Sequence, residues 1–402
     1  MTRRHKDHQE AELKFELDRR AASKVRHHPL LADACQQTEV WTEVERATWL
    51  IDRDGSQVEV ALDSGAVSLD GEKQDFRELE LELRTGEPAA LFDVAKQLGQ
   101  DMPLEIGVLS KEERGRMLGD HASGHENKAR EPDIGEDLSV GQAFAAIVQE
   151  CIRHFRLNQP LIIAERDPDA LHQARVAMRR LRTAFGLFRP VIRQGSLEPL
   201  QSELRAFLRP FGTARNLDVY LAHHGEELGW RDRRKLKAGR SESYDQVVET
   251  LNRQRTRDMM VDLVEWTASD ERSKGAAGDP VGKFAAKRLD RAWKKVRRGG
   301  SRLADLKEKQ LHRLRIDIKE LRYSVEFLGQ LYRPEAVRKF AGLLEAMQDC
   351  LGLMHDDMVS REIIAEYGLT QGGHPDAAVR SRQLGRLEKR FKRLKKAGPY
   401  WR

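Results

Sequence analysis

The feature that most constrains the fold of this 402-residue chain is a repeated helical pattern in its second half. The segments LHQARVAMRRLRTAF, beginning at Leu171, and LHRLRIDIKELRYSV, beginning at Leu311, correspond at a shift of 140 residues. The same shift aligns FGTARNLDV with LGLMHDDMV, and the opening segments VGQAFAAIVQECIRHF and VGKFAAKRLDRAWKKV correspond to within one residue. A shift that holds across separate helical segments predicts two copies of one helical unit.

Each copy carries two stripes of side chains along one helix. The apolar stripe of the first copy follows alternating steps of three and four, which predicts burial in a core; it consists of Leu171, Ala174, Met178, Leu181, Phe185 and Phe188. One position further on, the same steps produce a basic stripe on its flank. The basic stripes are His172, Arg175, Arg179 and Arg182 in the first copy and His312, Arg315, Lys319 and Arg322 in the second.

The basic stripes have two interpretations. Charged residues beside a core seam usually extend into solvent. However, like charges spaced three and four residues apart on a helix repel each other, and here that arrangement occurs twice. The alternative is anion binding, because guanidinium groups pair bidentately with phosphate oxygens. Four cations along about 15 Å of helix suit a linear chain of phosphates, and the sequence around them offers no acid, base and nucleophile set.

Neighbouring residues extend this hypothesis. Contact with phosphate is expected to favour the charged form of the stripe histidines, although each could instead be a helix-start residue bonded to nearby backbone. Arg215 is predicted to add to the basic surface, and His355 occupies its place in the second copy. The residues beside them are interpreted as helix caps or as partners that orient arginines; they are Asn216, Asp218, Asp356 and Asp357.

The charge is divided unevenly along the chain. Residues 1–139 contain 19 Lys and Arg against 31 Asp and Glu, a balance of −12, whereas residues 140–402 contain 52 against 34, a balance of +18. This asymmetry predicts two domains, of which the second has a polyanionic partner. The three widely spaced cysteines, the charged N-terminus and the lack of a long apolar run predict a cytoplasmic protein without a membrane partner.

The organisation predicted from local patterns is a mixed α/β region followed by helices. Strands are expected in EAELKFEL, VWTEVERATWLI, SQVEVALDSGAVSL and DFRELELELR, and helices in AASKVRHHPLLA, EPAALFDVAKQLGQ and SKEERGRML. The polar stretch 119–138 is predicted to be a linker. Beyond it, helices are expected over about 140–157, 169–192, 196–211, 214–228, 241–268, 281–298, 308–331, 334–351, 354–366 and from about 376.

With both basic stripes and the GTARNLDV segment present, residues of about 140–395 resemble the CHAD domain, the conserved histidine α-helical domain. The resemblance implies two pseudo-symmetric helical bundles that face each other across a basic groove and bind inorganic polyphosphate. It assigns the binding to His172, Arg175, Arg179, Arg182, His312, Arg315, Lys319 and Arg322. Asn216 stands where the family usually has Asp.

The first region resembles a CYTH domain, the triphosphate tunnel fold. EAELK matches its E-x-E-x-K pattern at Glu10, Glu12 and Lys14, and Glu80 lies in a later strand with Glu78 and Glu82. In that family carboxylates hold a divalent metal and basic residues grip a triphosphate, so the resemblance implies Mg²⁺ or Mn²⁺ at Glu10, Glu12 and Glu80. The chain departs from the family because only DACQQTE separates the first helix from VWTEVERATWLI, where the family has several strands. The same acids could be solvated residues of ordinary strands.

The sequence therefore predicts an α+β protein, with a truncated CYTH-like domain over 1–118, a linker over 119–138 and an all-α CHAD domain over 139–402. The repeats of that domain are expected at about 139–270 and 281–395. The predicted function is non-catalytic binding of inorganic polyphosphate, with an association with polyphosphate granules as one expectation. The alternatives are metal-dependent triphosphatase activity of the first domain and nucleic-acid binding by the basic helices. Few aromatic residues interleave those helices, which disfavours nucleic acid.

Overall fold

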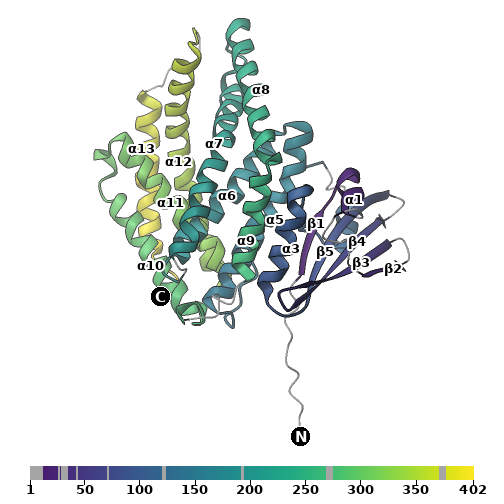
Figure 1. Cartoon of the computed structure of the whole chain (residues 1–402). Helices are drawn as coiled ribbons and strands as arrows, with labels where there is room; N and C mark the ends of the chain where they lie inside the picture. The colour runs from purple at the N-terminus through teal and green to yellow at the C-terminus, as the bar shows by residue number, and fades with distance from the viewer. Residues whose placement is uncertain are drawn as a thin grey trace. The chain divides into compact units, whose positions relative to one another are not determined.

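A computed structural model of the chain describes residues 12–25, 28, 35–41, 44–69, 72–119, 124–191, 194–268, 275–370 and 377–402 (Figure 1). The chain forms two compact units that interleave along the sequence. The first unit comprises Met1–Asn127, Ile152–Ala170 and Glu249–Asp270, and the second comprises Lys128–Cys151, Leu171–Val248 and Glu271–Arg402. The first unit therefore includes two segments from the helical half of the sequence.

The first unit is built on an antiparallel sheet with the strand order β2-β3-β4-β5-β1-β6. Its strands are β1 (Glu12–Glu16), β2 (Cys35–Trp41), β3 (Val44–Arg53), β4 (Ser56–Leu69), β5 (Glu72–Thr85) and β6 (Glu105–Ile106). The predicted strand SQVEVALDSGAVSL is β4. The prediction of one strand over VWTEVERATWLI is wrong, because β2 ends at Trp41 and β3 begins at Val44. The sequence of β2, CQQTEVW, does not alternate between apolar and polar residues. β2 is the end strand of the sheet and pairs along one edge, and an end strand can lack this alternation.

The sheet has one apolar face and one charged face. Val60 pairs with Leu81 and Leu62 pairs with Leu79 on the apolar face, and all four side chains are buried. Helix α3 (Pro88–Asp101) packs on β4, β5 and helix α9 (Gln254–Ala268) through its buried apolar residues. Short helices α1 (Arg19–Val25) and α4 (Lys111–Gly119) complete the unit, and α4 contacts β4 and β5.

The second unit is helical, and in Figure 1 its helices α6, α7, α11, α12 and α13 run alongside one another. The long helices are α5 (Val140–Glu165), α6 (Pro168–Phe188), α7 (Gln194–His224), α8 (Trp230–Asn252), α10 (Val281–Gly299), α11 (Glu308–Leu328), α12 (Pro334–Tyr367) and α13 (Ala377–Ala397). Part of α5 and the end of α8 belong to the first unit. The apolar stripe of α6 is buried throughout, as predicted. Cys151 and Cys350 are buried free thiols.

Two predicted helix breaks are wrong. The predicted helices 196–211 and 214–228 are one helix, α7, and the predicted helices 334–351 and 354–366 are one helix, α12. Gly212 and Gly352 therefore lie inside helices, because packing on neighbouring helices outweighs the weak helix propensity of glycine. Conversely, the predicted helix 241–268 is divided at Arg253 into α8 and α9.

Several features of the second unit are related by a shift of 140 or 141 residues. The bounds of α11 are those of α6 displaced by 140 at both ends, and α12 begins 140 residues after α7. At the starts of α5 and α10, the Val140 N–H donates to Asp279 C=O and the Val281 N–H donates to Leu138 C=O. The rings of Phe144 and Phe284 each lie 5.0 Å from that of Phe188. A pair of pseudo-symmetric units would show such reciprocal contacts.

No helix in the described part of the chain is long and apolar enough to span a membrane.

Candidate functional site

The side chains of α6 and α11 that the sequence singled out lie beside the buried seam of each helix. Helix α6 begins after Asp167, whose carboxylate accepts the N–H groups of Asp169 and Ala170 at 2.9 and 2.6 Å. At the start of α11, the Gln310 side chain accepts the N–H of Lys307 at 2.8 Å. Because each apolar stripe fixes the rotation of its helix, the basic stripe is held beside the core.

The two basic stripes meet in one cavity of about 770 Å³ in the second unit. Among the residues that the structure describes, nine Lys and Arg residues and one carboxylate, that of Glu320, line it. The cations are Arg175, Arg179, Arg182 and Arg189 from or just after α6, Arg288, Arg291 and Lys295 from α10, and Arg315 and Lys319 from α11. We call this cavity the basic groove. A space with so strong an excess of one charge favours an anionic ligand.

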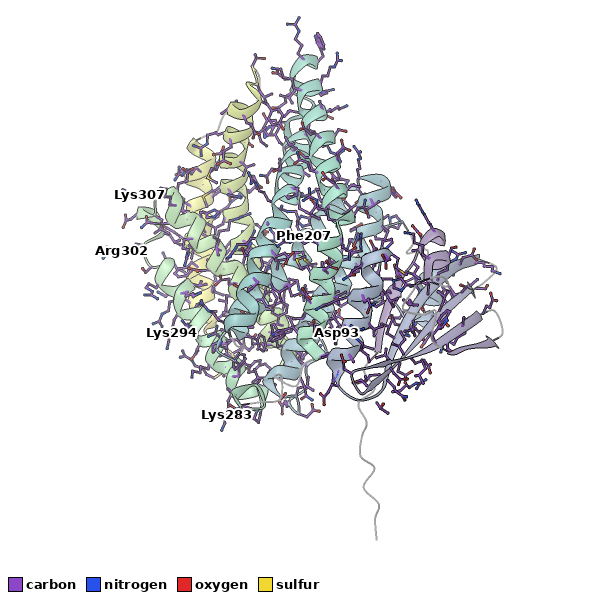
Figure 2. All side chains as sticks on the ribbon, viewed as in Figure 1. Asp93, Phe207, Lys283, Lys294, Arg302 and Lys307 are labelled. Atoms are coloured by element: carbon purple, nitrogen blue, oxygen red, sulfur yellow. The ribbon has the colours of Figure 1, made fainter. Side chains whose placement is uncertain are left out.

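The three α10 residues of the basic groove were not predicted as site residues. Arg288, Arg291 and Lys295 are separated by steps of three and four residues, as the basic residues of α6 and α11 are. This regular spacing is the sequence signal for a third basic stripe. Other basic residues of the same helix face away from the groove. In Figure 2, Lys283 and Lys294 lie at the periphery of the helical unit, and both are exposed. Only one face of α10 is therefore part of the site.

Several guanidinium groups around the groove have a buried Nε atom without a hydrogen-bond partner. Within the described residues, these include Arg179, Arg288, Arg315 and Arg322. A buried donor without a partner is costly, and most such donors in folded proteins are satisfied. Arg179, Arg288 and Arg315 line the groove, and unsatisfied cationic donors on one cavity are what a binding site for an oxyanion would show.

The groove shifts the proton equilibria of its own cations. Burial, together with the charges of Arg179 and Arg315, lowers the pKa of Lys319 from 10.5 to about 6. Burial and the charges of Arg179 and Arg215 lower the pKa of Arg175 to about 10. The charge of Arg179 on α6 lowers the pKa of Lys319 on α11, so the two basic stripes are close together.

Two histidines at the site, His172 and His355, have lowered pKa values in the ligand-free protein. Burial and the charge of Arg215 lower the pKa of His172 to about 4. The pKa of His355 is also lowered to about 4, by burial and by the charge of Arg315. The expected charging of His172 by phosphate would therefore have to overcome the surrounding arginines, and it stays a prediction.

Two stripe residues are held by specific neighbours. Gly212 of α7 lies against Arg175, since a Cβ atom built on it would be 3.1 Å from the Arg175 Nη1. Arg322 donates to Glu326 at 2.7 Å, and the burial of Glu326 raises the pKa of that carboxyl group. Glu326 also lies 3.8 Å from Arg180, which donates to the carbonyl of Arg130 at 3.1 Å. The buried Arg180 thus has a structural role outside the stripe.

A second, smaller cavity adjoins the groove residue Arg315. Its volume is about 290 Å³, and α7, α11, α12 and α13 supply its lining. We call it the histidine pocket, because four histidines line it: His223, His224, His312 and His355. The ring centroids of His312 and His355 are 5.4 Å apart.

The predicted binding residues are therefore distributed over adjoining places. The residues that line the basic groove are Arg175, Arg179, Arg182, Arg315 and Lys319. His312 lines the histidine pocket, together with Arg315. His172 and Arg215 line neither of these two cavities, but the charge of Arg215 acts on His172 and Arg175. Arg322 lies further along α11 in its ion pair with Glu326.

The interpretation of the nearby acids as helix caps is wrong. Asn216 and Asp218 lie inside α7, and Asp356 and Asp357 lie inside α12, so none stands at a helix end. Asp218 does orient an arginine, since it accepts from Arg240 Nε at 2.6 Å and from the Tyr244 hydroxyl at 2.8 Å. That arginine belongs to α8 and is not a stripe residue.

The charged face of the sheet forms a separate network in the first unit. Glu80 lies 2.9 Å from Lys14 Nζ and accepts from Arg46 at 2.7 Å. The buried Asp63 accepts from Arg46 Nε at 2.6 Å and from Lys111 Nζ at 2.5 Å. The neighbouring Glu78 and Glu16 pair with Arg114, and Glu16 also pairs with Arg156. Glu80, predicted to hold a metal, is thus neutralised by Lys14 and Arg46 of the same chain.

This network does not fit a divalent metal. Burial alone would raise the pKa of Asp63. Hydrogen bonds from Arg46 and Lys111 nevertheless hold this pKa below its ordinary value. The charged face therefore stabilises carboxylates through arginine and lysine, and the described residues contain no group of three acids, histidines or cysteines arranged for a metal. Glu10 and the side chain of Glu12 lie outside the described residues, so their assignment to Mg²⁺ or Mn²⁺ stays a prediction.

Comparison with known proteins adds an independent line of evidence. The model of the CHAD domain family matches residues 146–365. The crystal structure of the CHAD domain from the plant Ricinus communis is similar over 68% of this chain and 96% of that one, with a TM-score of 0.56 and 25% identity. A stretch of 78 residues is 33% identical to the inorganic triphosphatase of Haemophilus influenzae (strain ATCC 51907 / DSM 11121 / KW20 / Rd) and covers 19% of this chain and 22% of that protein. The family match extends over more than half of the chain and includes α6, α7, α10 and α11 whole. The chain therefore belongs to the CHAD domain family.

Proposed function

We propose that this protein binds inorganic polyphosphate in the basic groove, without catalysis by the helical unit. The observation that carries the proposal is the groove itself, where nine Lys and Arg residues and a single carboxylate line one cavity. The unpartnered Nε atoms of Arg179 and Arg315 support it, because a phosphate oxygen would supply the missing acceptor. Residues of both basic stripes line the groove, which supports a ligand that contacts the two stripes together.

The shape of the site favours a chain of phosphates over a single anion. The predicted basic stripe extends over about 15 Å of helix, and the cavity volume of about 770 Å³ exceeds that needed by one phosphate. Three helices contribute cations, so a linear polyanion would be contacted along its length and from several sides. Phosphate contacts of this kind are strongly dependent on salt.

A competition experiment tests the proposal against nucleic-acid binding through the same groove. A fluorescent long-chain polyphosphate is bound to the full chain and challenged with unlabelled polyphosphate or single-stranded RNA, at equal phosphate concentration and equal salt. We expect polyphosphate to compete far better, since few aromatic residues are available for base stacking along the basic helices. Equal displacement by RNA would contradict polyphosphate as the ligand.

A second candidate is metal-dependent hydrolysis of a triphosphate by the first unit. The 33% identity to an inorganic triphosphatase favours it, although the matched stretch covers only 22% of that protein. The ion pairs of Glu80 and Asp63 argue against it, because a metal would have to displace Arg46, Lys14 or Lys111. Phosphate release from tripolyphosphate with Mg²⁺ or Mn²⁺ that is lost in Glu12→Gln would support this activity, whereas no release would leave only binding.

A further inference from the structure

The histidine pocket differs in chemistry from the basic groove that it adjoins. Three arginines line it, Arg315, Arg361 and Arg380, but so do three acids, Glu308, Asp356 and Asp357. Arg361 pairs with Glu308 at 2.8 Å and with Asp357 at 3.4 Å. The pocket is therefore close to neutral in formal charge, and a chain of phosphates gains little by entering it.

The rest of the lining is apolar or aromatic. Leucine, methionine and valine side chains form much of the wall: Val219, Leu311, Leu351, Leu353, Met354 and Met358. Two pairs of rings lie along it, with centroids 5.4 Å apart for His312 and His355 and 4.9 Å apart for Tyr220 and His224. Leu353 is 50% exposed, which leaves an apolar side chain at the surface of the pocket. Such a lining suits a flat, uncharged ring system that can stack.

Arg315 connects the two cavities, because its side chain lines both of them. A ligand that has phosphates at one end and an aromatic ring at the other could place the phosphates among the groove cations and the ring in the pocket. The volume of about 290 Å³ is at the lower end of small-molecule sites, which is enough for a nucleobase but not for a large cofactor. The pocket also offers polar groups for the edge of a base, among them Asp356 and Gln383.

We propose that the histidine pocket binds the base of a nucleoside polyphosphate whose phosphates lie in the adjoining part of the basic groove. The rings of His312 and His355 would stack on the base, and Arg315 would contact the phosphate nearest to it. This inference rests on the proposed function only in that the groove binds phosphate. The base contacts involve a separate set of residues.

The test compares ATP with tripolyphosphate by titration calorimetry on the full chain, without divalent metal. Tripolyphosphate has the same number of phosphates and at least as much negative charge, so a purely electrostatic site would bind it at least as tightly. We expect ATP to bind about tenfold more tightly, the size of effect expected from stacking on one base. If ATP binds no more tightly than tripolyphosphate, the proposal that the histidine pocket binds the base is wrong.

Two variants locate the effect. His355→Ala removes a ring that is uncharged at pH 7, and Leu353→Ala removes an exposed apolar side chain, so neither changes the charge of the groove. Both should reduce ATP affinity to about that of tripolyphosphate and leave tripolyphosphate affinity unchanged. His125→Ala, at an exposed histidine of the other unit, is the control and should change neither.

The results separate this proposal from the function of the groove. If both variants retain the preference for ATP, or lose affinity for both ligands equally, the pocket does not bind the base. If long-chain polyphosphate fails to bind while ATP and tripolyphosphate bind and His355→Ala weakens the binding of ATP alone, the polyphosphate function fails and the nucleotide pocket stands.

Discussion

At the scale of single residues, the groove cations outnumber the acids near them within the described residues, and only some of these cations have an ion pair. Arg322 has an ion pair with Glu326, and Lys295 has one with Glu320. Arg179 and Arg315 have no such ion pair in the part of the chain that the structure describes, and their Nε atoms are buried without an acceptor there. The sequence revealed the α6 and α11 stripes because their spacing is regular and occurs twice. It could not reveal which cations the fold leaves unpaired, since that depends on where Glu326 and Glu320 fall in three dimensions.

Lys319 is expected to make the binding of polyanions dependent on pH. Burial, together with the charges of Arg179, Arg315, Arg175 and Arg322, lowers its pKa to about 6, so the amine loses its charge as the pH rises through this range. A bound phosphate chain would raise this pKa, so binding should take up protons and affinity should fall as the pH rises above about 6. Titrations in buffers of different ionisation enthalpy would measure the uptake.

Lys319→Arg is the matched variant for this effect. Arginine keeps its charge near neutral pH, so the variant should bind polyphosphate with less proton uptake and a flatter dependence on pH. The same proton uptake in the native chain and in this variant would show that another group titrates. The lowered pKa of Lys319 also affects folding. Because this pKa is lower in the folded state than in the unfolded state, Lys319 destabilises the ligand-free fold increasingly as the pH falls from 10.5 towards 6.

Asp63 is the residue on which the charged face of the sheet depends. It is fully buried, and Arg46 and Lys111 both donate to it. Asp63→Asn should lower the free energy of unfolding by about 3 kcal/mol, the low end for a buried pair, because Arg46 is partly exposed. Urea unfolding at pH 7 measures this change. Glu59→Gln, in the exposed pair with Arg84, should cost less than about 1 kcal/mol.

The sign of the pH effect follows from the direction of the Asp63 shift. Since the pKa of Asp63 is held below its ordinary value of 3.8, the native chain should lose stability as the pH falls below 3.8. The Asp63→Asn variant should lose less stability over the same pH range. An equal loss of stability in both proteins would contradict the role given to this carboxylate.

At the scale of elements, local sequence predicted most helices and strands but misplaced their breaks. SQVEVALDSGAVSL is a strand with the predicted bounds, because both alternation and turn residues mark it. In contrast, the glycine segments of α7 and α12 do not break those helices. Long-range packing decides these positions, and a single sequence does not contain that information in a local window. The two-residue strand β6 is likewise defined only by its pairing with β1.

Gly212 and Gly352 provide a matched pair of element-scale variants. A Cβ at Gly212 would press on the Arg175 guanidinium, whereas one at Gly352 would meet nothing within 4 Å. Gly212→Ala should therefore weaken polyphosphate binding by up to about tenfold, the value of one charge-assisted hydrogen bond. Gly352→Ala should leave binding unchanged and stabilise the helix by up to about 1 kcal/mol. Binding isotherms and thermal unfolding measure the two effects, and equal binding by both variants would contradict the proposed role of Gly212.

At the scale of the whole molecule, the chain divides its charge between two kinds of structure. In the sheet unit, the described acids and bases of the charged face neutralise each other in a network around Asp63, Glu80 and Arg114. In the helical unit, cations from three helices line one cavity, and Glu320 is the one acid among the described residues that line it with them. The sequence predicted this asymmetry as a −12 and +18 balance, and within the described residues the structure brings nine cations of the positive half together in the groove.

The central claim is that polyphosphate binds through the groove and not through the positive surface in general. The most direct test is retention of the full chain on immobilised long-chain polyphosphate at fixed salt, for the native protein and two double charge reversals. Arg179→Glu with Arg182→Glu changes the groove, and Lys283→Glu with Lys294→Glu makes the same change in charge at the periphery of the helical unit. Helical content measured by circular dichroism should be the same for all three. We predict that the groove variant loses retention while the peripheral variant keeps it; equal retention of both variants would contradict the assignment of the groove.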